Sequence, residues 1–265
     1  MMVHNNKNFN TLLVTILMFG SIGAQHSLSI NNNFNDTLLV KSDNDLSIKK
    51  ILLPAGLITV GAVSFAIPKV RDLNFNVRQE IKHHNLSGTK LDNYTQLVPI
   101  ALVYGLNAAG VKGKHNLRDR TVILLSSQVI TNTVVFSTKY IVNEERPDGS
   151  NNMSFPSGHA AIAFSTAQFM YREYQDSNIW LSLSGYPFAL FTSVYRVINN
   201  KHWVTDVIAG AGVGILSTEV AYWIFPKINS LFKDKGRKSY SMMVSPFYMK
   251  NSQYNSFGFN YQIIF

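Results

Sequence analysis

Six apolar segments, each nearly free of charged residues, constrain what this chain can fold into. They cover residues 51–67, 94–111, 121–138, 160–171, 179–194 and 204–225. Their lengths suit helices rather than strands, and few of them alternate apolar and polar residues as a half-buried strand would. Only 15% of the 265 residues are charged, so much of the chain is expected to be buried or in lipid. We therefore predict an all-α fold, a bundle of about six core helices within residues 48–226.

The mean hydropathy of +0.03 is low for a bundle of fully apolar membrane helices, so both a tight membrane bundle and a soluble all-α domain fit. Segment 121–138 contains Ser, Thr, Gln and Asn side chains, which lipid tolerates only when they are buried against other helices. Basic residues in 112–120 and after residue 225 favour an orientation in which loops 142–159 and 195–203 face outward. A cleaved leader followed by two spans would reverse this orientation, so one early segment would then have to lie on the membrane.

The N-terminal region resembles an export signal. Residues 1–24 contain Lys7, an apolar run and a small-residue stretch ending at Ala24, which is typical of a secretory signal peptide. Residues 25–47 are rich in Asn, Ser and Asp and lack periodicity, so we predict a flexible linker. An uncleaved membrane anchor is the alternative for the first segment.

The C-terminal region, residues 227–265, differs in character from the apolar segments. A basic stretch comes first, with Lys233, Lys235, Arg237 and Lys238. Aromatic-rich, alternating runs at 240–249 and 257–265 then predict a β-hairpin. We interpret this hairpin as a packing appendage, because a single hairpin cannot form a barrel.

The charge balance indicates an anionic partner. The chain has 24 Lys and Arg against 15 Asp and Glu, a formal net charge of +9. Its basic residues are scattered singly between apolar segments, which argues against nucleic acid and leaves acidic lipid or a phosphorylated substrate. The absence of cysteine excludes a disulfide scaffold, a thiolate nucleophile and a zinc site built on sulfur.

The first candidate motif ends the third apolar segment and contains Lys139, Arg146 and Pro147. Two cations seven residues apart lie about two helical turns, or roughly 10 Å, along one face. Once the chain bends at the proline, they would make two contacts with a tetrahedral anion. The alternative is an ordinary basic helix end that is stabilised by the helix dipole.

The second motif, Pro156-Ser157-Gly158-His159, opens the next apolar segment. A proline at a helix start, beside Ser and Gly, leaves backbone N–H groups free to bind an anion. His159 in the first turn is placed to exchange a proton with the bound group. A helix cap with an incidental histidine is the alternative.

The third motif contains Arg196, His202 and Asp206 and leads into the last apolar segment. His202 and Asp206 are four residues apart and share a helical face, so the carboxylate would fix the imidazole tautomer. The other ring nitrogen would then be free as a nucleophile. The alternative is an exposed pair of little energetic consequence, although an unpaired Asp in an apolar helix would be costly.

The three motifs in this order resemble the signature of the type 2 phosphatidic acid phosphatase (PAP2) superfamily, over about residues 121–225. The resemblance implies an all-α core shared with vanadium haloperoxidases and bacterial non-specific acid phosphatases. It also implies phosphatase action that needs no metal and no cofactor. One departure is Tyr195, where the family often has Ser before the arginine.

The resemblance also implies roles for the motif residues. The phosphate ligands would be three cations, a hydroxyl group and a backbone N–H, from Lys139, Arg146, Arg196, Ser157 and Gly158. His202 would attack phosphorus, oriented by Asp206, and His159 would protonate the leaving alkoxide. The three cations and the helix N-terminus are also sufficient, on physical grounds, to stabilise phosphoryl transfer without magnesium.

We therefore expect an exported, membrane-associated phosphatase of the cell envelope, with its site facing the periplasm. The expected substrate is a phosphorylated lipid: phosphatidate, phosphatidylglycerol phosphate, undecaprenyl pyrophosphate or a lipid A phosphate. A soluble periplasmic non-specific acid phosphatase is the main alternative. A vanadium haloperoxidase and a non-catalytic envelope protein fit the sequence less well, and nothing in it indicates an oligomeric state.

Overall fold

The computed structural model describes residues 46–84, 90–232, 241–250 and 255–264, the last two ranges as backbone. The predicted signal peptide and nearly all of the predicted linker lie outside the described residues, so both remain predictions. The predicted all-α fold is confirmed. The helices are α2 (Ile48–Ala62), η1 (Val63–Phe65), α3 (Pro68–His83), α4 (Asp92–Thr95), α5 (Val98–Ala108), α6 (Leu117–Val142), α7 (Gly158–Tyr174), α8 (Ile179–Leu183), α9 (Tyr186–Ile198) and α10 (Val204–Phe232).

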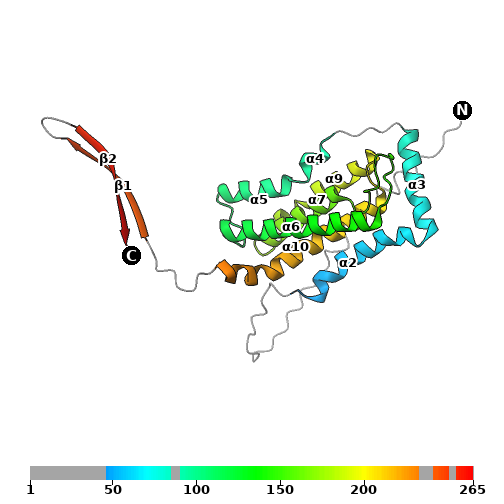
Figure 1. Ribbon diagram of the computed structural model, residues 1–265, viewed down its shortest axis with the longest axis horizontal. Coiled ribbons are helices and arrows are strands. Elements are labelled where there is room, and N and C mark those ends of the chain that lie inside the picture. The colour runs from blue at the N-terminus through cyan, green and yellow to red at the C-terminus, as the bar shows by residue number, and fades with distance from the viewer. Residues whose placement is uncertain (1–45, 85–89, 233–240, 251–254, 265) are drawn as a thin grey trace, which may run out of the picture. The chain divides into compact units, whose positions relative to one another are not determined.

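Helix α10 is central to the bundle and packs against α2, α6 and α7 (Figure 1). Glycines make its approach to α7 possible. A Cβ atom at Gly210 would lie 2.5 Å from the carbonyl oxygen of Ser157, and one at Gly214 would lie 2.1 Å from that of Ala161. Small residues allow two helix backbones to approach this closely. The first turns of α7 and α10, which contain the second and third motifs, are therefore held side by side.

Polar side chains inside the bundle bond to one another. The Ser127 hydroxyl lies 2.7 Å from that of Ser165 and 2.9 Å from that of Thr218. Gln128 donates to Ser165 at 3.0 Å. Polar residues of segment 121–138 are thus buried against other helices where α6, α7 and α10 meet. A membrane bundle requires such burial.

Two features differ from the sequence-based expectation. Segment 179–194 forms two helices, α8 and α9, because the chain turns at Gly185, where an added Cβ would lie 3.2 Å from Ala167 of α7. Helix α3 was not among the predicted apolar segments, because it is mostly polar and buries only Asn74, Val77 and Ile81. It lies across the end of the bundle where α10 begins (Figure 1), and Asn74 donates to Thr205 at 2.8 Å.

Three described helices are long and apolar enough to cross a membrane. They are Ile48–Phe65, Leu117–Val142 and Val204–Leu231. Helix α6 presents large apolar side chains to the outside of the bundle at helical spacing: Leu125, Val129, Phe136 and Tyr140. An exposed apolar stripe of this kind is typical of a membrane-facing surface. The helical bundle is therefore suited to membrane association.

The predicted hairpin in the tail is present. Strands β1 (Ser241–Lys250) and β2 (Asn255–Ile264) pair antiparallel, with Ser241 opposite Ile264 and Lys250 opposite Asn255. The aromatic residues Phe247, Tyr248, Phe257, Phe259 and Tyr261 of the two runs lie on these strands.

Candidate active site

The first motif follows the end of α6. Asn143 caps the helix in the left-handed conformation, with φ of 50°, and turns the chain away from the α6 axis. One turn earlier, Lys139 is buried and its Nζ donates to the carbonyl oxygens of Met153 at 2.6 Å and Ser154 at 3.0 Å. These bonds attach the end of α6 to the segment that leads into α7, so the first and second motifs are held together.

Arg146 lies in the loop after α6. Its backbone N–H donates to Asn151 at 3.0 Å, and its carbonyl accepts from Gly149 at 2.9 Å, which closes a tight turn around it. Burial and the nearby Arg196 guanidinium lower the pKa of Arg146. Its Nε is buried without a hydrogen-bond partner. Two neighbouring guanidinium groups with unused donors are a favourable site for a tetrahedral anion.

The second motif begins α7. Ser157 is the N-cap, and its side chain accepts from the backbone N–H of Ala160. Its own N–H donates to the carbonyl oxygen of Asp206 at 3.0 Å, so the second motif bonds directly to the third. In the first turn, Nε2 of His159 lies 2.9 Å from Oδ1 of Asn93 on α4. The N-terminus of α7 is thereby directed toward the start of α10.

The third motif contains a buried His–Asp pair. His202 is 2% exposed and Asp206 is fully buried, and Nδ1 of His202 lies 3.4 Å from Oδ2 of Asp206. The same oxygen accepts from the Ser154 hydroxyl at 2.5 Å and from the Trp203 N–H at 2.9 Å. The spacing of four residues therefore produces the predicted pair, and Nε2 of His202 points away from the carboxylate.

Arg196 lies in the last turn of α9 and is also buried. Its guanidinium donates to Oδ2 of Asp92 at 2.8 Å, and its carbonyl oxygen accepts from the N–H groups of Lys201 and His202. The tight turn that follows needs a left-handed residue, which is Asn200 with φ of 53°. Arg196 therefore contributes a cation, which Asp92 orients, and its backbone carbonyl fixes the loop that contains His202.

The electrostatics of the site favour neutral histidines and a bound anion. Burial lowers the pKa of His159 to about 4, and the charges of Arg196, Arg146 and Lys139 act in the same direction. Burial lowers the pKa of His202 to about 4 as well, against the opposing effect of Asp206. Three cations close together around two neutral imidazoles repel one another, and a bound negative group would relieve this repulsion.

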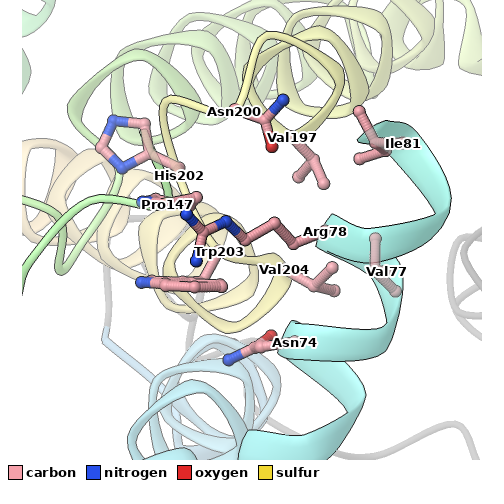
Figure 2. Close-up of a pocket in the computed structure, with 10 residues that line it drawn as sticks. All are labelled: Asn74, Val77, Arg78, Ile81, Pro147, Val197, Asn200, His202, Trp203 and Val204. Carbon is pink, nitrogen blue, oxygen red and sulfur yellow. The ribbon is translucent and has the colours of Figure 1, made fainter. Parts of the chain in front are cut away.

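A small pocket borders His202 on the α3 side (Figure 2). One wall comes from α3 and the other from the loop of the third motif. The lining residues are Asn74, Val77, Arg78, Ile81, Pro147, Val197, Asn200, His202, Trp203 and Val204. The Arg78 guanidinium lies 5.7 Å from the centre of the Trp203 ring, a cation–π distance. Helix α3 therefore covers one side of the third motif.

The structure brings the predicted site residues to one end of the bundle. Direct bonds join the three motifs, and the charges of Lys139, Arg146 and Arg196 act on His159. Sequence reasoning missed Asp92 and Asn93 of α4, which lie far upstream without a recognisable pattern. It also missed Ser154, which precedes the second motif by two residues and bonds to Asp206.

No group of three or more metal-ligating side chains occurs among the residues that the structure describes. The carboxylates of the site are instead bonded to nitrogen and hydroxyl donors, as Asp92 is to Arg196 and Asp206 is to Ser154 and Trp203. The chemistry that these residues can perform is anion binding, nucleophilic attack by an imidazole and proton transfer.

Two known proteins are similar to this chain. The chain is 33% identical over 251 residues to a lipid A 1-phosphatase of Porphyromonas gingivalis, an alignment that covers 90% of this chain. The same alignment covers 54% of the relative, so the chain spans about half the length of that curated protein. The crystal structure of Aquifex aeolicus LpxE superposes with a TM-score of 0.43 and 20% identity, over 56% of this chain and 94% of that one.

The family comparison covers the part of the chain that forms the site. The PAP2 superfamily model matches residues 120–230, which extend from the start of α6 to the end of α10. All three motifs lie within this range, and the structure joins them at one end of the bundle. Residues 120–230 of this chain are thus a match to the PAP2 superfamily.

Proposed function

We propose that this chain is a metal-independent phosphatase that removes a phosphate group from a membrane lipid through a phosphohistidine intermediate. The observation that carries the proposal is the buried His202–Asp206 pair, at 3.4 Å, beside three cations that converge on the same space. An imidazole that is held by a carboxylate, next to an anion site, is the arrangement that nucleophilic attack on phosphorus requires.

Substrate binding uses the cations and the α7 N-terminus. Lys139, Arg146 and Arg196 contact the non-bridging phosphate oxygens, helped by Ser157 and the N–H of Gly158. Transition-state charge accumulates on these equatorial oxygens, so donors that are fixed before the reaction lower the barrier most. Burial of Lys139 and Arg196 keeps them fixed, since each already bonds to a neighbouring oxygen.

The reaction proceeds in two steps. Nε2 of His202 attacks phosphorus in line with the bond to the leaving oxygen; an N–P bond forms and the P–O bond breaks. The proton on Nδ1 stays with the imidazole, where Asp206 stabilises the positive charge. Water then attacks phosphorus, the N–P bond breaks, and inorganic phosphate and free His202 result.

His159 moves the proton in both steps. In the free site the lowered pKa of His159 keeps it neutral. A bound phosphate dianion neutralises the cations that lower this pKa and favours the protonated form, so His159 becomes an acid as the substrate binds. It donates this proton to the leaving alkoxide and later takes one from the attacking water.

A lipid A-type phosphate is the substrate that we propose. The relative that is 33% identical over most of this chain is a lipid A 1-phosphatase. The exposed apolar face of α6, with Leu125 and Val129 more than half exposed, supports a bundle surrounded by acyl chains. A substrate embedded in the same bilayer could reach the site end of the bundle without leaving the lipid.

The test is phosphate release by the full chain in detergent micelles with EDTA present. The panel contains lipid A 1,4′-bisphosphate, phosphatidate, phosphatidylglycerol phosphate, undecaprenyl pyrophosphate and p-nitrophenyl phosphate, with His202→Ala as the blank. We expect turnover of lipid A, with mass spectrometry locating the loss at the 1-position. Turnover of the small ester alone would support a non-specific acid phosphatase instead. An active His202→Ala variant would refute the phosphohistidine step.

We also propose that the site end of the bundle faces the periplasm. The opposite end contains Lys112, Lys114 and Arg118, and cytoplasmic loops of membrane proteins are enriched in such residues. Helix α2 begins at this basic end, because its last turn meets the start of α10 at Ala209. The chain must then return from the site end to the basic end between α3 and α6, over α4 and α5, before α6 begins. A leader cleaved after Ala24 would place the start of α2 in the periplasm, whereas this orientation requires it in the cytoplasm. Cleavage at Ala24 and a complete crossing by α2 therefore exclude each other.

Cysteine labelling tests this orientation, because the chain has no cysteine of its own. Lys112→Cys and Ser150→Cys each introduce one thiol at an exposed position, at opposite ends of the bundle. A membrane-impermeant maleimide added to intact cells should label Ser150→Cys and not Lys112→Cys. The reverse pattern would place the site end in the cytoplasm.

A further inference from the structure

Glu144 lies beside the His202–Asp206 pair, although no motif contains it. Its carbonyl oxygen accepts from the N–H of Ser154 at 2.9 Å, and the Ser154 hydroxyl donates to Asp206. The next residue is anchored as well, since Trp203 Nε1 donates to the carbonyl of Glu145 at 2.9 Å. These bonds hold the Glu144 backbone against the start of α10, where its side chain meets Asp206.

Each of the two carboxyl groups has one buried oxygen, Oε2 of Glu144 and Oδ1 of Asp206, that accepts no bond from any donor of the described residues. Asp206 acts on Glu144 both through its charge and through a side-chain hydrogen bond. Two ionised carboxylates are acceptors only, so they can bond to each other only if one of them holds a proton.

The surrounding groups decide which of the two carboxyl groups holds the proton. Oδ2 of Asp206 faces three donor groups, from Ser154, Trp203 and His202, and donors of this kind stabilise an ionised carboxylate. Glu144 has no comparable donor at Oε2. Its burial and the negative charge of Asp206 raise the pKa of Glu144 to about 9, in spite of the opposing charges of Arg71 and Lys139.

We propose that Glu144 is a positioning residue whose side chain is a neutral carboxylic acid. Its O–H group donates a hydrogen bond to Oδ1 of Asp206 and so keeps Oδ2 directed at His202. The inference rests on the proposed phosphatase reaction, in which Asp206 orients the nucleophile. A carboxylate bonded at only one oxygen can rotate about its last side-chain torsion, whereas bonds at both oxygens fix its plane. Glu144 supplies the second bond.

Ionisation of Glu144 would disrupt this arrangement. A second negative charge beside Asp206 replaces an attractive bond with repulsion between buried like charges. The charged and titratable groups around the pair are Arg71 from α3, Lys139 from α6, Arg146 from the loop after α6, Arg196 from α9 and His202 beside Asp206. Turnover should therefore decline at alkaline pH as Glu144 loses its proton.

The experiment compares three variants of the full chain in detergent, with lipid A 1,4′-bisphosphate as substrate. Glu144→Gln keeps a hydrogen-bond donor of similar shape but cannot ionise. Glu144→Ala removes the donor, and Glu145→Gln is the matched control at the neighbouring exposed carboxylate. The rate kcat is followed across pH 6–10, and only the part of the alkaline decline that Glu144→Gln removes is assigned to Glu144.

We expect kcat of Glu144→Gln at pH 7 to stay within about twofold of wild type, and that of Glu144→Ala to fall about 10-fold. The alkaline decline near pH 9 should weaken in Glu144→Gln and persist in Glu145→Gln. A decline that is unchanged in Glu144→Gln, or equal losses in the Gln and Ala variants, would overturn the inference.

Infrared spectroscopy tests whether Glu144 is protonated, and it does not depend on turnover. The C=O stretch of a protonated carboxylic acid should be present in wild type at pH 7 and in Glu145→Gln, and its Glu144 component should be missing in Glu144→Gln. A spectrum that does not change in Glu144→Gln would refute the proton assignment in an active or an inactive protein. A Glu144 component in a protein that hydrolyses no phosphate would refute the proposed function and leave the proton assignment intact.

Discussion

Two buried carboxylates at opposite ends of the bundle have very different partners. Glu173, in the last turn of α7, accepts four bonds from three residues: from the His115 backbone and ring, from Arg120 and from the Tyr222 hydroxyl. Asp206, in the first turn of α10, has all its protein donors at Oδ2, and its Oδ1 has none. One carboxylate is satisfied at both oxygens, and the other depends on a protonated neighbour.

This difference separates structural from chemical polar groups. A buried charge whose donors are all supplied by the protein has its desolvation compensated, and it holds helices together. Among the described residues, Nη1 of Arg120 also lacks a partner at the Glu173 end, but the site end has more such atoms close together, on Arg146, Arg196, His202 and Asp206. Buried polar atoms without partners are rare and need an explanation, and a bound phosphate ester would supply one. Substitutions at the two ends should therefore affect different properties.

His202→Ala should produce the largest effect, and it should act on turnover alone. Removal of a nucleophile that has no substitute lowers kcat by about 10³-fold or more. Thermal unfolding should change little, since the His202–Asp206 contact is long, at 3.4 Å, and Nδ1 of His202 has no closer partner among the described residues. Phosphate release and unfolding are measured on the same preparation. Loss of folding together with activity would place His202 among the structural groups.

Glu173→Ala should produce the opposite result. It leaves Arg120, which is 1% exposed, as an uncompensated buried charge, at a cost of about 3–5 kcal/mol of unfolding free energy. The matched control is the double variant Arg120→Met/Glu173→Leu, which removes both charges and should recover most of the stability. Chemical denaturation in detergent measures both. A stable Glu173→Ala protein with reduced turnover would show that this end of the bundle also serves the reaction.

The sequence was sufficient to predict the motif residues, because the reaction requires particular residue types at close spacing. Helical periodicity places His202 and Asp206 on one face, and the cap signal places Ser157 at a helix start. It was not sufficient for Asp92 or Glu144. Asp92 lies 104 residues from its partner Arg196, so only the tertiary packing of α4 on α9 brings them together.

Local pattern also failed where a helix was polar or where packing set its end. Helix α3 buries only a few side chains, so no apolar run predicted it, yet it covers the third motif. The division of segment 179–194 at Gly185 depends on contact with α7, which no local signal records. Segment composition predicts that a helix forms, while contacts with other helices decide where it ends.

The stability of the site end should depend on acidity. In the folded chain the pKa of His202 is lowered to about 4 from 6.5, so the unfolded chain binds more protons between these values. The contribution of neutral His202 to the free energy of unfolding is therefore fully present above pH 6.5. It falls by about 3 kcal/mol as the pH drops toward 4. His202→Gln should lose this component. The difference between wild type and variant isolates it from Glu144, whose raised pKa has the opposite effect. Parallel curves for the two proteins would contradict a neutral His202.

Asp92→Asn should have a smaller effect, confined to the reaction. Arg196 is oriented by a charge-assisted bond of 2.8 Å to Asp92, and the amide replaces it with a weaker neutral acceptor. We expect kcat with lipid A to fall about 10-fold. Asp148→Asn is the matched control, because Asp148 pairs with Lys201 at 2.6 Å at the surface. Equal losses in the two variants would indicate a general electrostatic effect rather than orientation of Arg196.

Substitutions of Asn93 should have the smallest effect on turnover, and this effect should be specific to His159. Its Oδ1 lies 2.9 Å from Nε2 of His159, so Asn93→Ala frees the imidazole and should lower kcat by about fivefold. Asn93→Asp places a negative charge at the same distance, which favours the imidazolium and raises the pKa of His159 from its value of about 4. The alkaline limb of the kcat/KM profile, where the general acid of the free enzyme loses its proton, should then move to higher pH in Asn93→Asp but not in Asn93→Ala. An alkaline limb that stays in place in both variants would show that another group, rather than His159, sets it, and the proposed proton donor would have to be reassigned.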